Sequence, residues 1–456
     1  MLLLLLSIVA ASASSHFDSK LLYGFNYLNF TFESIDEELS YIRNQNYTNC
    51  LLAGIKMNST GTIFVSVPRW RSYVPATLST LDTSYDPPKL RPFPSWAGNE
   101  VNNSSMLQSV LGFEIDHDDN IWVLDQGRVD SVPVPGSTKL NKYSTETGEL
   151  IRSYNMSAEA DPALTFLNDV VIDTKNHYAY IADSGIPADS SLPTQGSLYT
   201  IDLDSGEVKR LLYSKVFTNP DPSVWVVVNG NRSNPDAPMS TGADGIALTC
   251  DCETLFFTPL TSRTLYAIKT EYLRKGYDDS ELSDKVITLG YKSSASDGLA
   301  SSSGGHLYLT AIEKNAVYRQ FSTIADKKDQ YYKRLETIAS NKDEMMWPDT
   351  IGFNNKDKKL LFVANQLQNF EAYNIDFENP RYGKYNYYIW QVDVKDQSYI
   401  YGCADSDYTD NKDATPEYVV PLIVGICAAV GITACVWCIY RKRREKTHKK
   451  PLIPNH

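Results

Sequence analysis

The chain has few basic residues and few histidines, and it lacks the short motifs of several large enzyme classes. It carries 43 Lys and Arg against 55 Asp and Glu, a net charge of −12. A nucleic-acid-binding surface is excluded, because it needs a basic face. No nucleophile elbow, zinc-protease helix, phosphate loop or dinucleotide fingerprint occurs in the sequence. Of the six histidines, only His117, His177 and His306 lie between residues 50 and 370, and we interpret them as surface residues rather than general bases. We therefore expect no cofactor and no metal site.

Long helical patterns are also scarce, whereas one strand pattern recurs six times between residues 50 and 370. Each copy has a small or acidic residue with apolar neighbours, then a polar turn, then a short strand centred on an aromatic residue. The six aromatics are Phe64, Trp122, Tyr180, Phe256, Tyr308 and Phe362. They lie 58, 58, 76, 52 and 54 residues apart, a period that fits four short strands with their loops. The pattern predicts an all-β, six-bladed β-propeller over residues 14–403, with a central tunnel. A β-sandwich followed by a second β domain is the alternative.

Both ends of the chain carry apolar segments that do not belong to this repeat. Residues 1–13 form an apolar run with an Ala-Ser-Ala cleavage site, which is typical of a secretory signal peptide. The segment from Tyr418 to Tyr440 has no charge and is long enough to span a membrane as one helix. The basic residues in 441–456 then place this tail in the cytosol. With an Asp-rich stalk over 404–417, the sequence predicts a single-pass type I protein of the plasma membrane, its propeller outside the cell.

Cysteines and glycosylation motifs fit that location. Three cysteines lie in the apolar span, and the four others allow three disulfide pairings that the sequence leaves open. These candidates are Cys50, Cys250, Cys252 and Cys403. Seven Asn-X-Ser/Thr motifs lie outside the membrane and predict a glycoprotein. They are at Asn29, Asn46, Asn58, Asn102, Asn103, Asn155 and Asn231.

Several strings in the repeats go beyond a general propeller pattern. They are Val67–Trp70 (VPRW), Val74–Leu78 (VPATL), Leu90–Trp96 (LRPFPSW), Trp122–Asp125 (WVLD), Leu167–Asp173 (LNDVVID) and Tyr180–Gly185 (YIADSG). With them, residues 20 to 400 closely resemble the insect yellow and major royal jelly protein family. The resemblance implies a six-bladed propeller and a secreted protein. Some members of the family bind biogenic amines at the tunnel mouth, and others are linked to melanin formation, including a proposed dopachrome-converting activity.

The resemblance also implies where a ligand would bind. The amine binders hold their ligand with a Thr and an Asn about fifteen residues apart, a spacing that Thr350 and Asn365 reproduce. Two residues beyond the Asn, where an aromatic residue is expected, this chain has Leu367. That difference removes a stacking or cation–π surface.

Acidic residues open four of the inner strands and are expected to converge near the axis. They are Asp169, Asp244, Asp297 and Asp349. Such carboxylates either cap loop amides or, where free, line a negative cavity that attracts a protonated amine or chelates a divalent cation. We select Asp169 and Asp297 as ligand-binding candidates. The insertion Thr218–Met239 either covers the tunnel mouth or is a glycosylated surface loop.

Three functions remain open from the sequence. The first is a non-catalytic propeller that binds a small cationic aromatic ligand of the biogenic amine or catechol class. The second is an enzyme: a dopachrome-converting isomerase, or a metal-dependent lactonase suggested by Asn168 and Asp169, which are similar to the metal-ligand positions of gluconolactonase-type propellers. The third is a propeller whose glycans and surface loops bind another protein.

Overall fold

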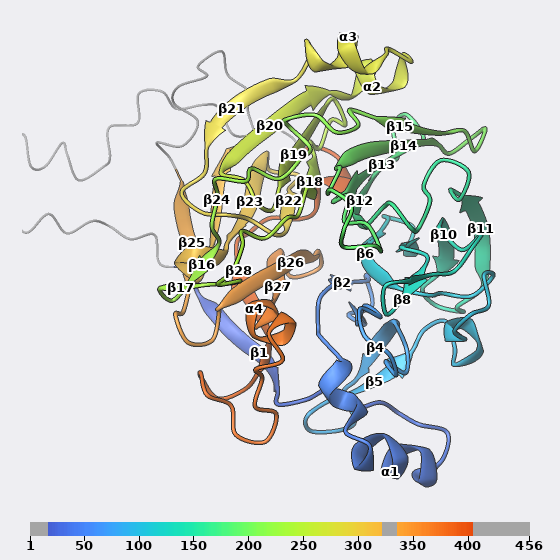
Figure 1. Ribbon diagram of the computed structural model, residues 1–456, viewed down its shortest axis with the longest axis vertical. Coiled ribbons are helices and arrows are strands. Elements are labelled where there is room, and N and C mark those ends of the chain that lie inside the picture. Colours follow the sequence, from blue (N-terminus) through green and yellow to red (C-terminus); the bar gives the residue numbers. More distant parts are fainter. Residues whose placement is uncertain (1–16, 322–334, 405–456) are drawn as a thin grey trace, which may run out of the picture. The chain divides into compact units, whose positions relative to one another are not determined.

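Six four-stranded antiparallel sheets surround a central axis in the computed structural model, which describes residues 17–321 and 335–404 (Figure 1). The innermost strands of neighbouring sheets contact one another around the axis. This arrangement confirms the six-bladed β-propeller that the repeat predicts. Each predicted unit supplies the two inner strands of one blade, joined by a short turn.

Within each blade the strands follow one another from the axis outward. The first three blades are β2 (Ile55–Met57), β3 (Ile63–Ser66), β4 (Leu78–Asp82), β5 (Lys89–Pro92); β6 (Val110–Ile115), β7 (Asn120–Asp125), β10 (Lys139–Ser144), β11 (Leu150–Asn155); and β12 (Leu167–Asp173), β13 (Tyr178–Asp183), β14 (Ser197–Asp202), β15 (Val208–Leu211). The last three are β18 (Ala243–Leu248), β19 (Thr254–Pro259), β20 (Thr264–Lys269), β21 (Ile287–Tyr291); β22 (Leu299–Ser301), β23 (His306–Ala311), β24 (Ala316–Phe321), β25 (Glu336–Ser340); and β26 (Trp347–Asn354), β27 (Lys359–Asn365), β28 (Tyr387–Asp393), β1 (Ser19–Phe25).

The sixth blade joins the two ends of the propeller. Strand β1 comes from the N-terminal side and pairs antiparallel with β28, from Ser19 opposite Val392 to Phe25 opposite Tyr387. The outermost strand of the last blade is thus supplied from the other end of the chain, which closes the ring of blades. The fold is therefore closed by main-chain hydrogen bonds between residues more than 350 positions apart.

The repeated aromatics form the core between the blades. All six aromatic residues at the centres of the predicted units are at most 5% exposed. Trp122 and Tyr180, from two neighbouring blades, belong to one apolar cluster, and Phe64 belongs to another. Burying such large side chains between sheets removes apolar area from water and so stabilises the stacked blades.

Several short elements lie outside the blades, in the segments that connect the blade strands. Two small ribbons are β8 (Arg128–Val129) with β9 (Val132–Pro133), and β16 (Val227–Val228) with β17 (Asn231–Arg232). The helices are α1 (Ile35–Arg43), α2 (Thr270–Arg274), α3 (Asp279–Ser283) and α4 (Leu367–Glu371), with 3-10 turns η1 (Asn46–Asn49), η2 (Ala97–Asn99), η3 (Ile312–Lys314) and η5 (Tyr399–Tyr401). Helix α1 begins with a capping box, in which Ser34 and Glu37 bond each other's main-chain N–H.

The segment after β28 crosses the axis and closes one end of it. The Asp396 carboxylate accepts hydrogen bonds from His306 Nδ1 (2.9 Å) and from the Gly304 N–H (3.0 Å) at the β22–β23 turn. Three residues on, Tyr399 is buried and its hydroxyl oxygen accepts a hydrogen bond from the Ile172 N–H of β12 at 2.8 Å. We call Asp396–Cys403 the plug segment. The central tunnel that we expected is therefore blind at this end.

A disulfide holds the far end of the plug segment. It joins Cys403 to Cys250, in the turn between β18 and β19, and it resolves the pairing that the sequence left open. Two of the four candidates, Cys50 and Cys252, are instead buried free thiols, so the expectation that they form disulfides is wrong in this structure. Both lie in apolar clusters of the core, and burial raises the pKa of each thiol to about 12.

The predicted glycosylation sites differ in accessibility. Asn102, Asn155 and Asn231 are exposed. Asn58 is 9% exposed, and its side-chain oxygen accepts hydrogen bonds from Thr60 and Thr62. If glycans are attached, the exposed sites are the ones that the fold leaves open to them.

The predicted signal peptide (residues 1–13), membrane span (Tyr418–Tyr440) and cytosolic tail, with the stalk from residue 405, lie outside the described residues. Within residues 17–321 and 335–404, no helix has the length and apolar character needed to cross a bilayer.

Candidate binding site at the mouth of the propeller

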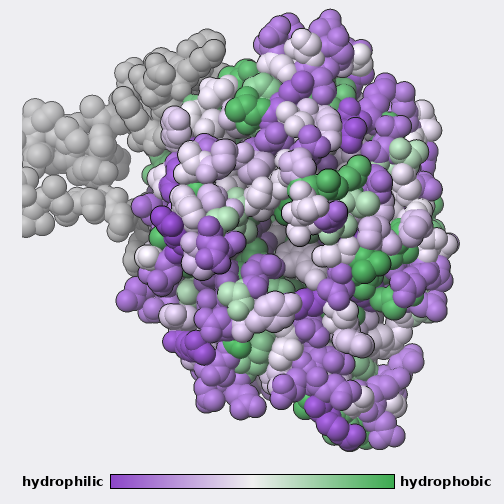
Figure 2. Space-filling view, viewed as in Figure 1, coloured by the Kyte–Doolittle hydropathy of each residue, from purple (hydrophilic) through white to green (hydrophobic). Residues whose placement is uncertain are grey.

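A cavity of about 380 Å³ lies at the end of the axis opposite the plug segment. It is lined by residues from the inner strands, from α4 and from the insertion Thr218–Met239. Figure 2 shows a hollow near the centre of the face that carries α4 and the β8 and β16 ribbons. We call it the mouth cavity. Its volume lies within the range of roughly 300–1,000 Å³ that small-molecule sites occupy.

The base of the mouth cavity is built by one repeated position near the start of the inner strand. In five blades the residue at this position lines the cavity, and in four of these it lies within a β-bulge of that strand. The five residues are Leu111, Asn168, Asp244, Asp297 and Asp349. The first blade has Ala53 at this position. The repeat therefore brings three carboxylates together at the axis.

In four blades the next residue along the inner strand is a glycine that passes close to the neighbouring blade. A Cβ on Gly245 would lie 2.4 Å from the Asp297 carbonyl oxygen, and one on Gly298 would lie 2.4 Å from the Asp349 carbonyl oxygen. Glycine permits this approach. In the third and sixth blades the same position holds Asp169 and Thr350. This one-residue offset separates Asp169 from the other three acids.

Each of the three axial carboxylates is held by neutral donors. Asp244 Oδ2 accepts a hydrogen bond from Asn168 Nδ2 at 2.7 Å. Asp297 Oδ2 accepts one from the Trp347 indole N–H at 2.6 Å. Asp349 accepts from Asn365 Nδ2 (2.8 Å) and from the Thr350 hydroxyl (3.1 Å). Among the described residues, the ion pairs involve other carboxylates. None of the three axial carboxylates is therefore in an ion pair with a basic side chain.

Burial and mutual repulsion favour the protonated forms of these acids. Burial raises the pKa of Asp297 to about 6. Burial, and then the charge of Asp297, raise the pKa of Asp244 and of Asp349 well above the ordinary value. The buried Lys292 interacts electrostatically with Asp244, but burial lowers the pKa of this lysine to about 7. The mouth cavity therefore presents acids that a bound cation would help to ionise.

This shift predicts a pH effect on stability. Because the folded-state pKa of Asp297 is raised, folding favours its protonated form, and the penalty for ionising it grows as the pH rises from about 4 to about 6. Asp297→Asn should remove that penalty. The variant should gain about 2–3 kcal/mol of unfolding free energy relative to the wild type between pH 4 and pH 7, at 1.36 kcal/mol per pKa unit. Denaturant unfolding of both proteins across this range measures it; a constant difference would contradict it.

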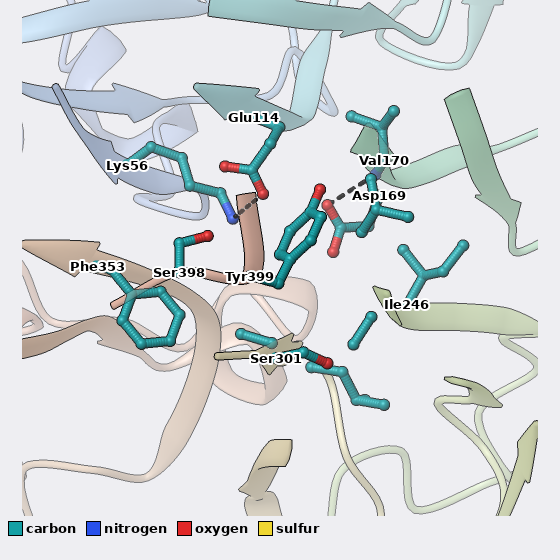
Figure 3. A pocket seen from close by; sticks show the side chains of 13 residues that line it. Lys56, Glu114, Asp169, Val170, Ile246, Ser301, Phe353, Ser398 and Tyr399 are labelled. Carbon is teal, nitrogen blue, oxygen red and sulfur yellow. Dashed lines mark hydrogen bonds and ion pairs between the residues drawn. The ribbon is translucent and has the colours of Figure 1, made fainter. Parts of the chain in front are cut away.

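A second, much smaller cavity lies deeper on the axis, and Figure 3 shows the side chains around it. We call it the hub cavity; its volume of about 10 Å³ holds about one water molecule. The Tyr399 ring lies between the Lys56–Glu114 pair, 3.4 Å apart, and Asp169 (Figure 3). Burial raises the pKa of Asp169 to about 7, against the lowering effect of Lys56. The hub cavity is too small for an organic ligand.

The upper wall of the mouth cavity is aromatic and cationic in part. Trp70 and Phe166 lie with ring centroids 5.9 Å apart, and the Arg128 guanidinium lies 5.2 Å from the Phe166 centroid. Arg69 also lines the cavity, but its N–H groups donate to main-chain oxygens, including Leu107 O at 2.8 Å. Its charge is therefore committed to holding the loops of the wall.

The insertion Thr218–Met239 contributes to the same wall. Ser233, Asn234 and Met239 line the mouth cavity. Val226 and Val228 are buried and share an apolar cluster with Leu367. The insertion therefore covers part of the mouth, as one of the two interpretations expects, and Asn231 stays exposed on it.

The predicted site residues do not all lie in the same cavity. Asp297 and Leu367 line the mouth cavity, whereas Asp169 lines the hub cavity. Thr350 and Asn365 converge, as their spacing suggests, but both hold Asp349. Asn168, Asp244 and Asp349 also line the mouth cavity, although they are not among the ligand-binding residues predicted from the sequence. Alignment of the six units on their first apolar strand residue would have placed these three beside Asp297.

The fold and the site define a six-bladed propeller with a cavity lined by acidic residues at one end of its axis. The profile of the Major royal jelly protein family matches residues 108–403, which is more than half of the chain, so the chain belongs to this family. It is 26% identical over 339 residues to Protein yellow of Drosophila guanche, covering 67% of this chain and 57% of that protein. Protein yellow of Drosophila erecta is also 26% identical, with 67% and 60% covered. The chain thus spans less than two thirds of the length of these relatives.

Solved structures show a more distant likeness. A luciferin-regenerating enzyme aligns with a TM-score of 0.46 at 12% identity, covering 84% of this chain and 97% of its own. A calcium-binding protein, regucalcin, from Agrobacterium tumefaciens aligns with a TM-score of 0.45 at 14% identity, covering 76% and 91%. Nothing about function follows from scores at this level.

Proposed function

We propose that this chain is an extracytoplasmic yellow-family propeller that binds a small organic cation with an aromatic ring in its mouth cavity. The observation that carries the proposal is the group of three buried axial carboxylates, Asp244, Asp297 and Asp349, at the base of a ligand-sized cavity. A protonated amine placed there would supply the positive charge that these acids lack. The strongly acidic remainder of the chain outside the predicted tail would attract such a cation over longer distances.

The rest of the cavity suits an aromatic ring. Trp70 is only partly buried and offers an apolar face beside Phe166. Leu367 stands where the resemblance implies an aromatic residue, so stacking from α4 is missing and van der Waals contact takes its place. We expect affinity to depend mainly on the charge of the ligand.

The location is proposed on two grounds. The disulfide between Cys250 and Cys403 is typical of proteins from oxidising compartments. The predicted signal peptide and membrane span agree with a propeller on the outer side of the plasma membrane. Together they support a cell-surface or secreted protein.

Calorimetry tests the proposal, which predicts that the affinity for an amine depends on pH. The full-length chain, purified in a mild detergent, is titrated with tyramine, dopamine and serotonin at pH 7.4 and pH 5. We expect binding to release protons, because a cation stabilises the ionised acids. With the pKa of Asp297 at about 6, affinity should fall roughly tenfold from pH 7.4 to pH 5.

The control for this titration is 2-phenylethanol, which has the ring without the ammonium group and should show no pH dependence. The absence of heat at millimolar amine would end the proposal, and equal amine affinity at both pH values would remove the role of the carboxylates. A dopachrome-conversion assay on the same sample tests the enzyme alternative. For the lactonase alternative, Asn168 and Asp169 face different cavities and do not form a common ligand set.

A further inference from the structure

Strand β11 is the outermost strand of the second blade, and its outer edge is open to solvent (Figure 1). Its first four residues are all exposed, and two of them, Leu150 and Ile151, are apolar and 49% and 52% exposed. None of the other five outer strands has more than two consecutive exposed residues in its described part. An exposed apolar edge offers unpaired N–H and C=O groups to a strand of another chain. The edge of β11 is therefore a site of unwanted association unless something covers it.

The first blade shows how this propeller covers an outer edge. There the N-terminal segment lies along β5. The Leu90 N–H donates to the Asn29 carbonyl oxygen at 2.8 Å, and the Leu90 carbonyl oxygen accepts from the Thr31 N–H at 2.9 Å. Among the described residues, no main-chain group from outside the second blade bonds to the main chain of residues 150–155. The described protein chain thus covers the edge of β5 and leaves that of β11 open.

The sequence of β11 protects this edge only in part. Ile151 has no partner on β10, because the register shifts by one residue at this point. Such a bulge interrupts pairing at one end of the strand. The charge of Arg152 does not lie along the edge, because its Nη2 donates to the main-chain oxygen of Asp204, in the third blade, at 2.9 Å. From Arg152 to Asn155 the strand pairs regularly with β10, so this part of the edge has the geometry that a further strand needs.

A glycosylation motif lies at the end of this regular part. Asn155 is the last residue of β11, and Ser157 completes the motif. The Asn155 side chain is exposed, and its Oδ1 accepts a hydrogen bond from the Ser157 N–H at 2.9 Å. The Nδ2 atom, to which a glycan is joined, takes no part in that bond. The two other exposed motifs, at Asn102 and Asn231, do not lie on the outer strand of a blade. Asn155 therefore combines an accessible motif with an open edge.

We propose that an N-glycan on Asn155 covers the edge of β11 and prevents this strand from pairing with another chain. Glycosylation joins Asn155 Nδ2 to the anomeric carbon of an oligosaccharide that is carried on a lipid diphosphate. The bond from that carbon to the diphosphate oxygen breaks, the lipid diphosphate leaves, and Nδ2 gives up one proton. The attached sugar is bulky and soluble, so it keeps a second strand away from the edge. The inference is independent of ligand binding and rests only on the extracytoplasmic location in the proposed function, where such glycans are added.

The test uses the full-length chain, produced in eukaryotic cells that glycosylate secreted proteins and purified in a mild detergent. Mass spectrometry of its glycopeptides should find Asn155 occupied. Asn155→Gln and Ser157→Ala remove the motif through different residues. Both should raise the self-association constant, measured by analytical ultracentrifugation, at least about tenfold, a factor that one or two main-chain hydrogen bonds between chains supply. Asn231→Gln removes an exposed motif away from the outer strands and is the control; it should stay within about twofold of the wild type.

A charge placed on the edge distinguishes edge pairing from misfolding. The double variant Ile151→Lys, Asn155→Gln still lacks the glycan, but a lysine on an edge strand opposes pairing with another strand. We expect its self-association constant to return to within about threefold of the wild type. Misfolding caused by the loss of the glycan would not be reversed by this second substitution.

Three results would overturn the inference. They are an unmodified Asn155 beside an occupied Asn102 or Asn231, motif variants that associate no more than the wild type, and association that persists when the lysine is added. If none of the exposed motifs carries a glycan, the proposed extracytoplasmic location fails, and the inference fails with it. Amine binding at the mouth is measured separately, so its failure would leave the role of Asn155 in place.

Discussion

Replacing Asp244 by asparagine is expected to weaken the binding of an organic cation roughly 100-fold while making the free protein more stable. The loss of affinity follows from removing a buried charge opposite a cation, which costs about 2–5 kcal/mol in such pairs, and about 2.7 kcal/mol corresponds to 100-fold. Asp244 lines the mouth cavity and is 2% exposed, so water screens it little. Calorimetry with tyramine at pH 7.4 measures the change.

The gain in stability has a separate cause. Burial and the charges of Asp297, Asp349 and Asp169 raise the pKa of Asp244, so ionising this acid at neutral pH destabilises the folded protein. An asparagine keeps an oxygen that can accept from Asn168 Nδ2, now 2.7 Å from the carboxylate. We therefore expect the Asp244→Asn variant to be more stable than the wild type at pH 7.4, measured by denaturant unfolding. A variant that loses both affinity and stability would indicate a structural role for Asp244.

Asp173→Asn is the matched control. Asp173 is a fully buried aspartate on β12, but it is paired with Arg274 at 3.3 Å and accepts hydrogen bonds from Asn176 and Tyr180. Its replacement should destabilise the fold by about 1–3 kcal/mol, because Arg274 loses its partner, and should leave amine affinity unchanged. The two substitutions thus differ in the sign of the stability change and in their effect on binding.

The blade count was predictable because it depends on a local pattern. Each unit repeats an apolar inner strand, a turn and a central aromatic residue, and the buried aromatics such as Tyr180 and Phe256 occupy equivalent places between blades. Strand β1 did not match this pattern, because it completes the last blade by pairing with residues far along the chain. The number of blades can therefore be predicted from local sequence, whereas the closure of the ring cannot.

The axial site was only partly predictable, because a one-residue difference in register decides whether an aspartate faces the mouth cavity. The strings Asn168-Asp169 and Asp297-Gly298 both place an aspartate near the start of an inner strand. Asp297 lies at the cavity-facing position, but Asp169 lies one residue later, and successive residues of a strand point in different directions. A bulge at this point adds to the offset. Residue type alone could not distinguish them, whereas exact register could.

The plug segment could not be foreseen at all. It has no strand alternation or helical period, and Tyr399 is fixed by contacts with β12, more than 200 positions earlier. The sequence shows a tyrosine in an aromatic stretch before the predicted stalk, and nothing in that stretch marks a position on the axis. The pairing of Cys403 with Cys250 was open for the same reason, since it depends on where the segment crosses the propeller.

Removing this disulfide is expected to cost about 2–5 kcal/mol of stability and to open the blind end of the axis. The bond links residues 153 positions apart, so the unfolded chain gains much freedom when it is absent. The double variant Cys250→Ser, Cys403→Ser avoids leaving one reactive thiol. Cys252→Ala, a free buried thiol two residues from Cys250, is the control and should cost less than about 1.5 kcal/mol.

Hydrogen–deuterium exchange, which reports local opening, provides a second and independent test of this prediction. The plug segment is held at its start by Asp396 at the β22–β23 turn and at its end by the disulfide. Without the disulfide, Tyr399 should leave the axis more often, and the Ile172 N–H, which donates to the Tyr399 hydroxyl, should exchange with solvent deuterium at least about tenfold faster. Inner-strand amides of the first blade should keep their exchange rates. Unchanged exchange at Ile172 would mean that the turn contacts of Asp396 and the burial of Tyr399 are sufficient to close the axis, and that the disulfide stabilises the propeller without sealing it.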